Sequence, residues 1–589
     1  MKKQFRHDLP FGASPLPSGA TRFRFWAPAQ THVSVEVEGM PAVPMRAVGD
    51  GWFEAESSCE AGARYLYRLG SGLAVPDPAS RAQADDVHGP SLVVDPHRYE
   101  WRHGAWRGRP WHEAVLYELH AGAFGGFAGV QAALPILADL GVTAVELMPI
   151  NDFPGERNWG YDGVLPFAPD RSYGTPDELK ALVDTAHGLG LMMFLDVVYN
   201  HFGPDGNYLS AYAPQVFRDD IATPWGAAID FRRPEVRRYF TENVLYWLEE
   251  YRFDGLRFDA VHAISEADWL DEMAAEVRRS VEPGRHVHLV LEHDGNVADH
   301  LRREFDAQWN DDAHHVLHAL LTGESDGYYA DYADRPARHL ARALAEGFVY
   351  QGDPSAYRSD EARGTPSSDL SPTSFVLFLQ NHDQIGNRPF GDRLTEHVAP
   401  DLLEAAVALQ LLCPHIPMIF MGEEDASRSP FLYFTDHAGD LAEAVREGRR
   451  REFAGFKGFA PGEGTSSIPD PNEPATFERS RLVPDAEQGT ARHRLYRKLL
   501  GIRREWLVPR LEGARSLGAL PIEPSTVVAR WRMSDGATLV LACNLGREPA
   551  QIEEVQGDLL YESRAGAADA ARSGRVAGAT TVAFLVPAS

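Results

Sequence analysis

The stretches LMMFLDVVYN (residues 191–200) and GLRFDAV (residues 255–261) decide the fold. Each is a nearly continuous apolar run, which is typical of a strand that is buried on both faces of a parallel sheet. Amphipathic stretches, for example residues 175–190 and 233–251, separate such runs and predict helices. This alternation indicates an α/β fold in which helices cover a parallel sheet.

Working outward from these two stretches, we find more apolar runs of the same kind in the middle of the chain. They are residues 114–120, 143–150, 286–293, 304–310, 374–381 and 415–422. Eight strand–helix units are most economically arranged as a closed (β/α)8 barrel, the TIM barrel. We therefore expect a barrel over residues 99–507, with a short insertion at residues 201–232.

The two ends of the chain show a different pattern. Residues 1–98 contain alternating runs such as TRFRFWAP and HVSVEVEG, separated by Pro, Gly and Asp. This pattern predicts an N-terminal β-sandwich of the immunoglobulin-like or carbohydrate-binding-like kind. Residues 508–589 return to short strands, among them TVVARWRM and ATLVLACN, and predict a C-terminal β-sandwich.

Composition excludes several classes of protein. The 589 residues include 57 Lys and Arg against 85 Asp and Glu, a formal charge of −28. Nucleic-acid binding and anionic-membrane binding both need a basic surface, so neither is expected. The sequence has no apolar run of the ~18 residues that a membrane-spanning helix needs. Cys59, Cys413 and Cys543 lie far apart, which is typical of a reducing compartment, and we expect a cytoplasmic location.

Three acidic residues end predicted strands on the side where barrel enzymes place their active sites. Asp259 ends the fourth strand, Glu292 the fifth and Asp383 the seventh. Any one of them could equally cap the following helix, but the three together favour an active site. Arg257 lies two residues before Asp259, so on a strand both side chains point the same way, and the arginine can keep the carboxylate ionised.

Paired carboxylates at one rim suit glycoside hydrolysis. One carboxylic acid protonates the leaving oxygen, and the other carboxylate attacks the anomeric carbon when the two groups are only ~5–5.5 Å apart. A third, ionised carboxylate would stabilise the positive charge of the transition state. The sequence therefore predicts a retaining glycosidase.

The segments around these residues resemble a known family. DVVYNH (196–201), GLRFDAVH (255–262), Glu292 and QNHDQ (380–384) are similar to the four sequence regions of the α-amylase superfamily, glycoside hydrolase family 13. The resemblance implies that Asp259 is the nucleophile, Glu292 the acid/base and Asp383 the transition-state stabiliser. It implies that Asp196 is structural.

Within this superfamily the chain most resembles the maltooligosyltrehalose trehalohydrolase group, through YELHAGAF (117–124), WNDDAHH (309–315) and NHDQIGNRPFGDR (381–393). That resemblance implies hydrolysis of the α-1,4 bond next to the terminal trehalose unit of maltooligosyltrehalose, with release of trehalose. It also implies functional coupling to a maltooligosyltrehalose synthase. The alternatives are a 1,4-α-glucan branching enzyme, another α-amylase-family glucan hydrolase, or a non-catalytic glycogen-binding protein.

We further expect a set of substrate-binding residues around the carboxylates, in part from the resemblance. For some of Asp311, Asp312, His314 and His315 the expectation rests on their position at the rim after the sixth strand. For Tyr161, which follows the second strand, the alternative is a buried aromatic corner. The expected set is His120, Tyr161, Asp162, His201, Arg257, His262, Asp311, Asp312, His314, His315, His382, Gln384 and Asn387.

Two departures from the superfamily bear on metals and on the acid. Calcium-binding members have a His where this chain has Ala263, and Asn200 alone matches a calcium ligand. Because a hard cation needs six to eight oxygen ligands, we expect no metal and no cofactor. A zinc site among the histidines of residues 314–318 remains an alternative, without a third ligand at a fixed spacing.

The second departure concerns the acid. In the superfamily this glutamate usually stands in an E-x-x-W context, which residues 292–295 (EHDG) lack.

Overall fold

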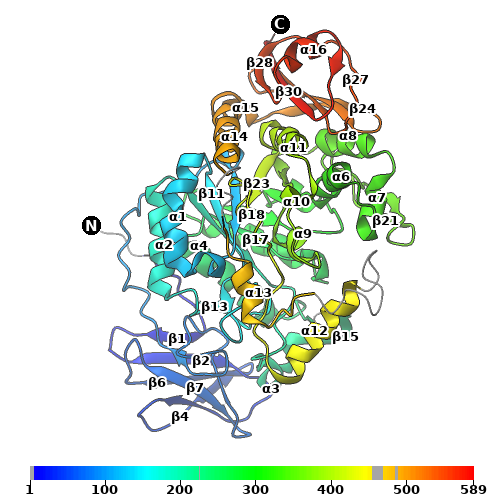
Figure 1. The fold of residues 1–589 in the computed structure, drawn as a ribbon. Coiled ribbons are helices and arrows are strands. Elements are labelled where there is room, and N and C mark those ends of the chain that lie inside the picture. Colours follow the sequence, from blue (N-terminus) through cyan, green and yellow to red (C-terminus); the bar gives the residue numbers. More distant parts are fainter. Residues whose placement is uncertain (1–4, 224–225, 454–467, 484–488, 589) are drawn as a thin grey trace.

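A computed structural model describes residues 5–223, 226–453, 468–483 and 489–588. Figure 1 shows three parts stacked along the molecule: N-terminal sheets at the bottom, a barrel with its helices in the middle, and a C-terminal sheet at the top. No helix within the described residues has the length and apolar character needed to cross a membrane.

Two sheets form the N-terminal part. The first has the order β1 (Gly12–Pro15), β2 (Thr21–Trp26), β6 (Trp52–Ser57) and β5 (Arg46–Gly49). The second joins β4 (Val43–Pro44), β3 (Val33–Val37), β7 (Arg64–Leu69) and β8 (Ala74–Val75), with β9 (Ser91–Leu92) beside β7. Alternate residues of β2 and β7 are buried, and Phe25 stacks on Tyr67 with ring centroids 4.2 Å apart. The alternating sequence pattern therefore packs one sheet on the other.

The eight apolar runs form the predicted closed parallel barrel, with neighbours in chain order. Its strands are β10 (Leu116–Leu119), β11 (Ala144–Leu147), β14 (Met192–Val197), β17 (Gly255–Phe258), β18 (His288–Leu291), β19 (Ala307–Trp309), β22 (Phe375–Leu377) and β23 (Ile416–Phe420). All residues of these strands are buried. The barrel interior and the helical layer bury the two faces of each strand, which explains why the strands are apolar without alternation.

Helices follow most barrel strands. They are α1 (Gly126–Leu140), α2 (Pro176–Gly188), α4 (Pro234–Glu249), α5 (Asp268–Ser280), α6 (Asp311–Thr322), α8 (Pro336–Glu346), α11 (Pro400–Leu412) and α14 (Gly489–Ile502). The start of α2 shows how sequence sets these boundaries, because Thr175 and Glu178 form a capping box there. The connection from β18 to β19 contains only a short 3-10 turn, η5 (His300–Arg302).

Short hairpins occupy segments outside the predicted barrel strands. The insertion at 201–232 contains α3 (Leu209–Tyr212), β15 (Phe217–Thr223) and β16 (Gly226–Ile229). A second hairpin pairs β12 (Asn151–Asp152) with β13 (Leu165–Pro169). A third pairs β20 (Asp353–Ser355) with β21 (Glu361–Arg363). Most of these strands are too short to show a hydrophobic period, which is why the sequence did not reveal them.

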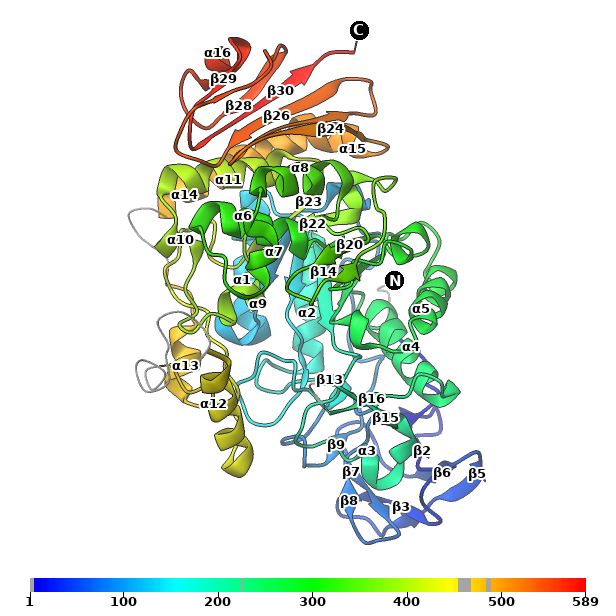
Figure 2. The same ribbon diagram turned by 90° about the vertical axis from the view of Figure 1, so that its right-hand side faces the viewer.

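The C-terminal part is a five-stranded sheet in the order β24 (Arg515–Ile522), β25 (Thr526–Arg532), β26 (Thr538–Asn544), β30 (Thr580–Val586) and β28 (Asp558–Glu562). Figure 2 shows α8 and α11 lying beneath it. Trp531 faces the main core, whereas Val528 of the same strand joins a second core formed with α16 (Ala567–Arg572) and β29 (Arg575–Val576). The second layer of the predicted sandwich is thus mainly this helix and a two-stranded ribbon, β27 (Ala550–Gln551) with β29.

Candidate active site

Three carboxylates lie at the C-terminal rim of the barrel. Asp259 directly follows β17, and Glu292 directly follows β18. Asp383 belongs to a short helix after β22, α9 (His382–Gly386), which Asn381 caps by accepting a hydrogen bond from the backbone of Gln384. The rim is the end of the barrel where active sites of this fold are built.

One guanidinium joins the carboxylates. Arg257 Nη1 donates to Asp196 Oδ2 at 2.6 Å and to Asp259 Oδ1 at 2.9 Å, and its Nη2 donates to Glu292 Oε2 at 2.9 Å. The side chain is 2% exposed, and its guanidinium carbon lies 4.1 Å from the ring centroid of Trp309. A single buried cation therefore sets the relative positions of Asp259 and Glu292.

Each of these two carboxylates has one further partner. Asp259 Oδ2 accepts from Asn200 Nδ2 at 2.8 Å, so both of its oxygens are held. Glu292 Oε2 accepts from the backbone N–H of Ala260 at 2.7 Å. Ala260 has a φ of 40°, in the left-handed region that residues other than glycine rarely adopt. Such strained backbone is concentrated at functional sites.

The pKa of Glu292 departs strongly from that of a free glutamate. Burial raises this pKa well above its ordinary value; Arg257 opposes the rise, while the negative charges of Asp259 and Asp311 add to it. The sequence analysis placed the acid at this residue. A carboxyl group with a raised pKa remains protonated near neutral pH, as a general acid requires.

A hydrogen-bonded chain lies behind Asp259. Tyr161 donates from its hydroxyl to Asp196 Oδ2 at 2.6 Å and accepts from His382 Nε2 at 2.9 Å. His382 Nδ1 donates to Glu118 Oε1 at 2.5 Å. Burial lowers the pKa of His382, but the charge and hydrogen bond of Glu118 outweigh it and raise the net pKa. Both ring nitrogens of His382 are thus occupied by protein groups, and His382 orients Tyr161.

Asp162 and His201 lie beside Tyr161. Asp162 Oδ2 accepts from Asn158 Nδ2 at 2.7 Å and lies 3.5 Å from His437 Nε2. His201 Nε2 lies 2.9 Å from the carbonyl oxygen of Tyr161. These contacts bring residues that follow the second and third barrel strands together beside Tyr161.

His120 is placed differently from the prediction. Its side chain is buried at 1% exposure, where its Nδ1 accepts from the backbone of Ala123 and its Nε2 contacts the carbonyl oxygen of Asn158 at 2.8 Å. Because Asn158 in turn donates to Asp162, His120 is linked to the site through Asn158. It is not among the residues that line the cleft described next.

A cleft of about 750 Å³ opens next to Glu292. It is lined by eight of the predicted site residues, namely Arg257, His262, Glu292, Asp311, His315, Asp383, Gln384 and Asn387. Burial raises the pKa of Asp311 to about 7, and the charges of Asp294 and Asp383 contribute. The cleft also receives Tyr357 and Arg358 from the β20–β21 hairpin; Tyr357 is 57% exposed.

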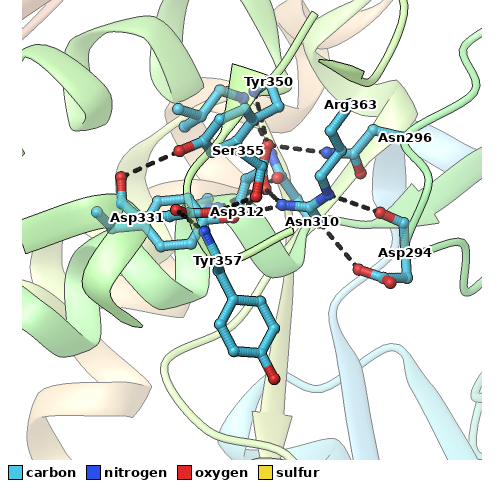
Figure 3. A network of polar contacts seen from close by, with 12 residues as sticks. Asp294, Asn296, Asn310, Asp312, Asp331, Tyr350, Ser355, Tyr357 and Arg363 are labelled. Carbon is cyan, nitrogen blue, oxygen red and sulfur yellow. Dashed lines mark hydrogen bonds and ion pairs between the residues drawn. The ribbon is translucent and has the colours of Figure 1, made fainter. Parts of the chain in front are cut away.

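The structure does not support a substrate contact for Asp312 or His314. Asp312 is fully buried, and all its hydrogen bonds go to protein groups around Arg363 (Figure 3). His314 is 1% exposed and stacks on Phe378 with ring centroids 5.4 Å apart. Both residues lie on α6, whose first turn exposes Asp311 to the cleft and turns the next residue inward.

Several residues of the site carried no signal in the sequence. Glu118 lies inside the apolar run of the first barrel strand, and His437 lies far from any motif. Arg449, in α12 (Gly439–Phe453), donates to Asn387 Oδ1 at 3.1 Å, and Asn387 Nδ2 donates to Asp383 Oδ1 at 2.6 Å. Folding alone brings Glu118, His437 and Arg449 close to the site, because they lie far apart in the sequence.

The histidines at 314, 315 and 318 are spread over one helix and its aromatic neighbours. His318 Nε2 lies 2.7 Å from Glu324 Oε2, and its ring stacks on Tyr329. Across the described part of the chain, no three His, Cys, Asp or Glu side chains are arranged to hold a metal ion. Asn200, which matches one calcium ligand, uses its amide nitrogen to bind Asp259.

Comparisons with known proteins agree with this geometry. The family model described as "Alpha amylase, catalytic domain" matches residues 93–218, and a "Domain of unknown function (DUF3459)" matches residues 514–584. A crystal structure of a putative alpha amylase from Salmonella typhimurium is 43% identical, with a TM-score of 0.92 over 98% of this chain and 100% of that chain.

Curated relatives match over most of their length. The malto-oligosyltrehalose trehalohydrolase of Deinococcus radiodurans is 43% identical over 568 residues, which cover 94% of this chain and 92% of the relative. The protein of the same name from Saccharolobus solfataricus is 39% identical, over 85% of this chain and 87% of the relative. The chain therefore belongs to the malto-oligosyltrehalose trehalohydrolase family.

Proposed function

We propose that the protein is a retaining glycoside hydrolase that cleaves the α-1,4-glucosidic bond next to the terminal trehalose unit of maltooligosyltrehalose. The products are free trehalose and a maltooligosaccharide. The observation that carries the proposal is the contact of Arg257 with both Asp259 and Glu292, in a chain whose full-length relatives bear the trehalohydrolase name.

In the first half of the reaction, Glu292 donates its proton to the glycosidic oxygen as the bond from that oxygen to the anomeric carbon breaks. Asp259 attacks the anomeric carbon and forms a covalent glycosyl-enzyme, and trehalose leaves with the transferred proton. The raised pKa of Glu292 keeps this proton available. The hydrogen bonds from Arg257 and Asn200 hold the side chain of Asp259 in position for this attack.

In the second half, the Glu292 carboxylate takes a proton from water. The resulting hydroxide oxygen attacks the anomeric carbon, and the bond to Asp259 breaks, so that both catalytic groups return to their starting states. Two displacements retain the α configuration in the released maltooligosaccharide. Asp383 stabilises the positive charge that develops on the sugar in both steps.

The remaining site residues divide between the two sides of the bond. We assign the sugar that reacts to Tyr161, Asp162 and His201, which lie together on the nucleophile's side. We assign the rest of the substrate to the cleft residues His262, Asp311, His315, Gln384 and Asn387. His120 and His382 support these groups from behind, and Asp312 and His314 have no substrate contact in this proposal.

A product assay tests the proposal. The purified protein is incubated separately with maltooligosyltrehalose, maltoheptaose and amylose, and the products are identified by chromatography. Trehalose should appear from the first substrate far faster than glucose or maltose from the second. New α-1,6 branches on amylose without trehalose release would instead identify a branching enzyme, and rapid cleavage of maltoheptaose would identify a general glucan hydrolase.

We also propose that the enzyme works in sequence with a maltooligosyltrehalose synthase in the cytoplasm. Its substrate carries a trehalose end that another enzyme must build on a maltooligosaccharide. The three unpaired, buried cysteines are compatible with a reducing compartment. A mixture of the two enzymes should convert maltoheptaose to trehalose, whereas either enzyme alone should not.

A further inference from the structure

The loop that follows Glu292 is held by a residue from a distant segment. Arg363 ends strand β21, and its Nε donates to the carbonyl oxygen of Asp294 at 2.8 Å, while its Nη2 donates to Asp294 Oδ1 at 3.2 Å. Asp294 lies two residues after Glu292. Figure 3 shows Arg363 between Asp294 on one side and Asp312 on the other. The arginine therefore ties the acid's loop to the interior of the protein.

Asp312 anchors the arginine. Arg363 Nη1 donates to Asp312 Oδ1 at 2.8 Å, and neither side chain exceeds 5% exposure. Asp312 accepts hydrogen bonds from four further donors, and these are Asn296 Nδ2, Tyr332 Oη, and the backbone N–H groups of Val349 and Tyr350, at 2.5–3.0 Å. Five hydrogen-bond donors hold the position of the Asp312 carboxylate, and its contact with Arg363 in turn holds the guanidinium in place.

The loop itself offers little that could fix it by packing. Its sequence, His293-Asp294-Gly295-Asn296, lacks a large apolar side chain, and it departs from the E-x-x-W context of the superfamily. Asn296 has a φ of 50°, which keeps the loop tightly turned. Its backbone is held instead by polar side chains, because Gln308 Nε2 donates to the carbonyl oxygen of His293 at 3.0 Å next to the contact of Arg363.

We propose that Arg363, anchored on the buried Asp312, is a positioning residue for Glu292: it fixes the loop that sets where the acid presents its proton. The inference rests on the proposed role of Glu292 as the acid. Arg363 acts through the Asp294 backbone, and Glu292 keeps its own contacts with Arg257 and Ala260. Loss of Arg363 should therefore impair proton donation while nucleophilic attack by Asp259 continues.

Two substrates with the same glycosyl part separate these steps. Maltotriosyltrehalose needs a proton on its leaving oxygen, whereas α-maltotriosyl fluoride releases fluoride without one. The value of kcat/KM reports the first half-reaction for both substrates. The inhibition constant of trehalose reports binding of the leaving group independently, so a binding defect is distinguished from a misplaced acid.

The test variant is Arg363→Lys, which keeps a cation beside Asp312 but cannot reach Asp312 and Asp294 together as the planar fork does. Arg363→Gln is the second variant in case the first fails to fold. The matched control is Arg342→Gln. Arg342 ties the same hairpin to α8 through Asp353 at 2.7 Å and does not contact the acid's loop.

We expect Arg363→Lys to lose roughly tenfold or more in kcat/KM on maltotriosyltrehalose and less than about threefold on the fluoride, because general acid catalysis contributes 10²–10⁴-fold. The trehalose inhibition constant should stay within about twofold, and Arg342→Gln should show no selective loss. Equal losses on both substrates, a parallel rise in the inhibition constant, or no loss at all would overturn the inference. Wild-type protein that releases no trehalose would instead refute the proposed function.

Discussion

Arg257 is one buried cation shared by three acidic side chains, and both this imbalance and burial affect the pKa values of the site. Its guanidinium contacts Asp196, Asp259 and Glu292, so their charges are not all neutralised. Burial raises the pKa of Asp196 to about 6 and that of Glu292 well above its ordinary value; Arg257 opposes both shifts, and the charge of Asp259 adds to them. Burial, together with the negative charge nearby, therefore favours the protonated form of Glu292, the residue that we propose as the acid.

The proposed nucleophile and the proposed acid should respond differently to substitution. Asp259→Asn should abolish turnover of every substrate, because no nucleophile remains. Glu292→Gln should lose roughly 10²–10⁴-fold in kcat/KM on maltooligosyltrehalose and far less on α-maltotriosyl fluoride, which needs no proton. Steady-state kinetics on the two substrates measure this difference. If Glu292→Gln were as inactive on the fluoride as on the natural substrate, the acid would be another residue.

Asp311 should tune the pH dependence of the acid. Its negative charge raises the pKa of Glu292, so its removal should lower that pKa. Glu292 donates only while protonated, and activity is lost as pH rises through its pKa. The alkaline limb of the kcat/KM profile should therefore move to lower pH in Asp311→Asn. Asp326→Asn is the control, because Asp326 lines the same cleft but is not among the largest causes of the shift in the pKa of Glu292. An unmoved alkaline limb in Asp311→Asn would contradict the argument.

The positions of the three rim carboxylates, which we propose are catalytic, could be predicted from sequence because each lies at the end of an apolar run. Recognising such a run requires no knowledge of which residues are its neighbours in the fold. Glu118 gave no such signal, since it lies within the apolar run itself and its partner His382 is 264 residues away. Asp312 was predicted to bind substrate, but it is fully buried in the structure. Motif spacing places it beside Asp311, but only the folded helix determines which of the two carboxylates faces the cleft.

Long, buried secondary-structure elements could be predicted from the sequence, whereas short, partly exposed ones could not. The barrel strands are apolar because both faces are covered, and all eight could be located. The β20–β21 hairpin has strands of three residues each and a polar turn, so no periodic pattern marks it. Yet this hairpin supplies Tyr357, Arg358 and Arg363 to the site. The elements with the weakest sequence signal therefore shape the cleft, while those with the strongest signal build the scaffold.

Substitutions in strand β25 should reveal how much each face of the C-terminal sheet contributes to the free energy of unfolding. Trp531 is fully buried in the main core, whereas its neighbour Arg532 is exposed on the same strand. Trp531→Ala should lower the free energy of unfolding by about 3–5 kcal/mol, the usual cost of deleting a buried aromatic side chain. Arg532→Ala should change it by less than about 0.5 kcal/mol. Urea unfolding followed by fluorescence and circular dichroism tests this, and similar midpoints for both variants would contradict it.

On the scale of the whole molecule, the flanking sheets brace the barrel from opposite ends. Tyr239 of α4 donates to the carbonyl oxygen of Pro78 at 2.6 Å in the N-terminal part, and Thr581 of β30 donates to the carbonyl oxygen of Ala405 in α11 at 2.7 Å. Neither contact involves a rim residue. The N-terminal part also contacts loops that follow barrel strands: the backbone N–H of Gly155 donates to Asp86 Oδ2 at 3.2 Å, and Gln30 Nε2 donates to the carbonyl oxygen of Ala211 at 3.0 Å.

The whole protein should need no metal for activity or stability. Calcium would require several oxygen ligands. Asn200 is the one residue that matches a ligand, and both the nitrogen and the oxygen of its side-chain amide already contact protein groups. Asn200 Nδ2 donates to Asp259 Oδ2 at 2.8 Å, and its Oδ1 lies 2.5 Å from His201 Nδ1. Ala263 supplies no ligand at the position where calcium-binding relatives have His. Activity and melting temperature should therefore be unchanged after exhaustive treatment with EDTA. Loss of either that calcium or zinc restores would contradict the prediction.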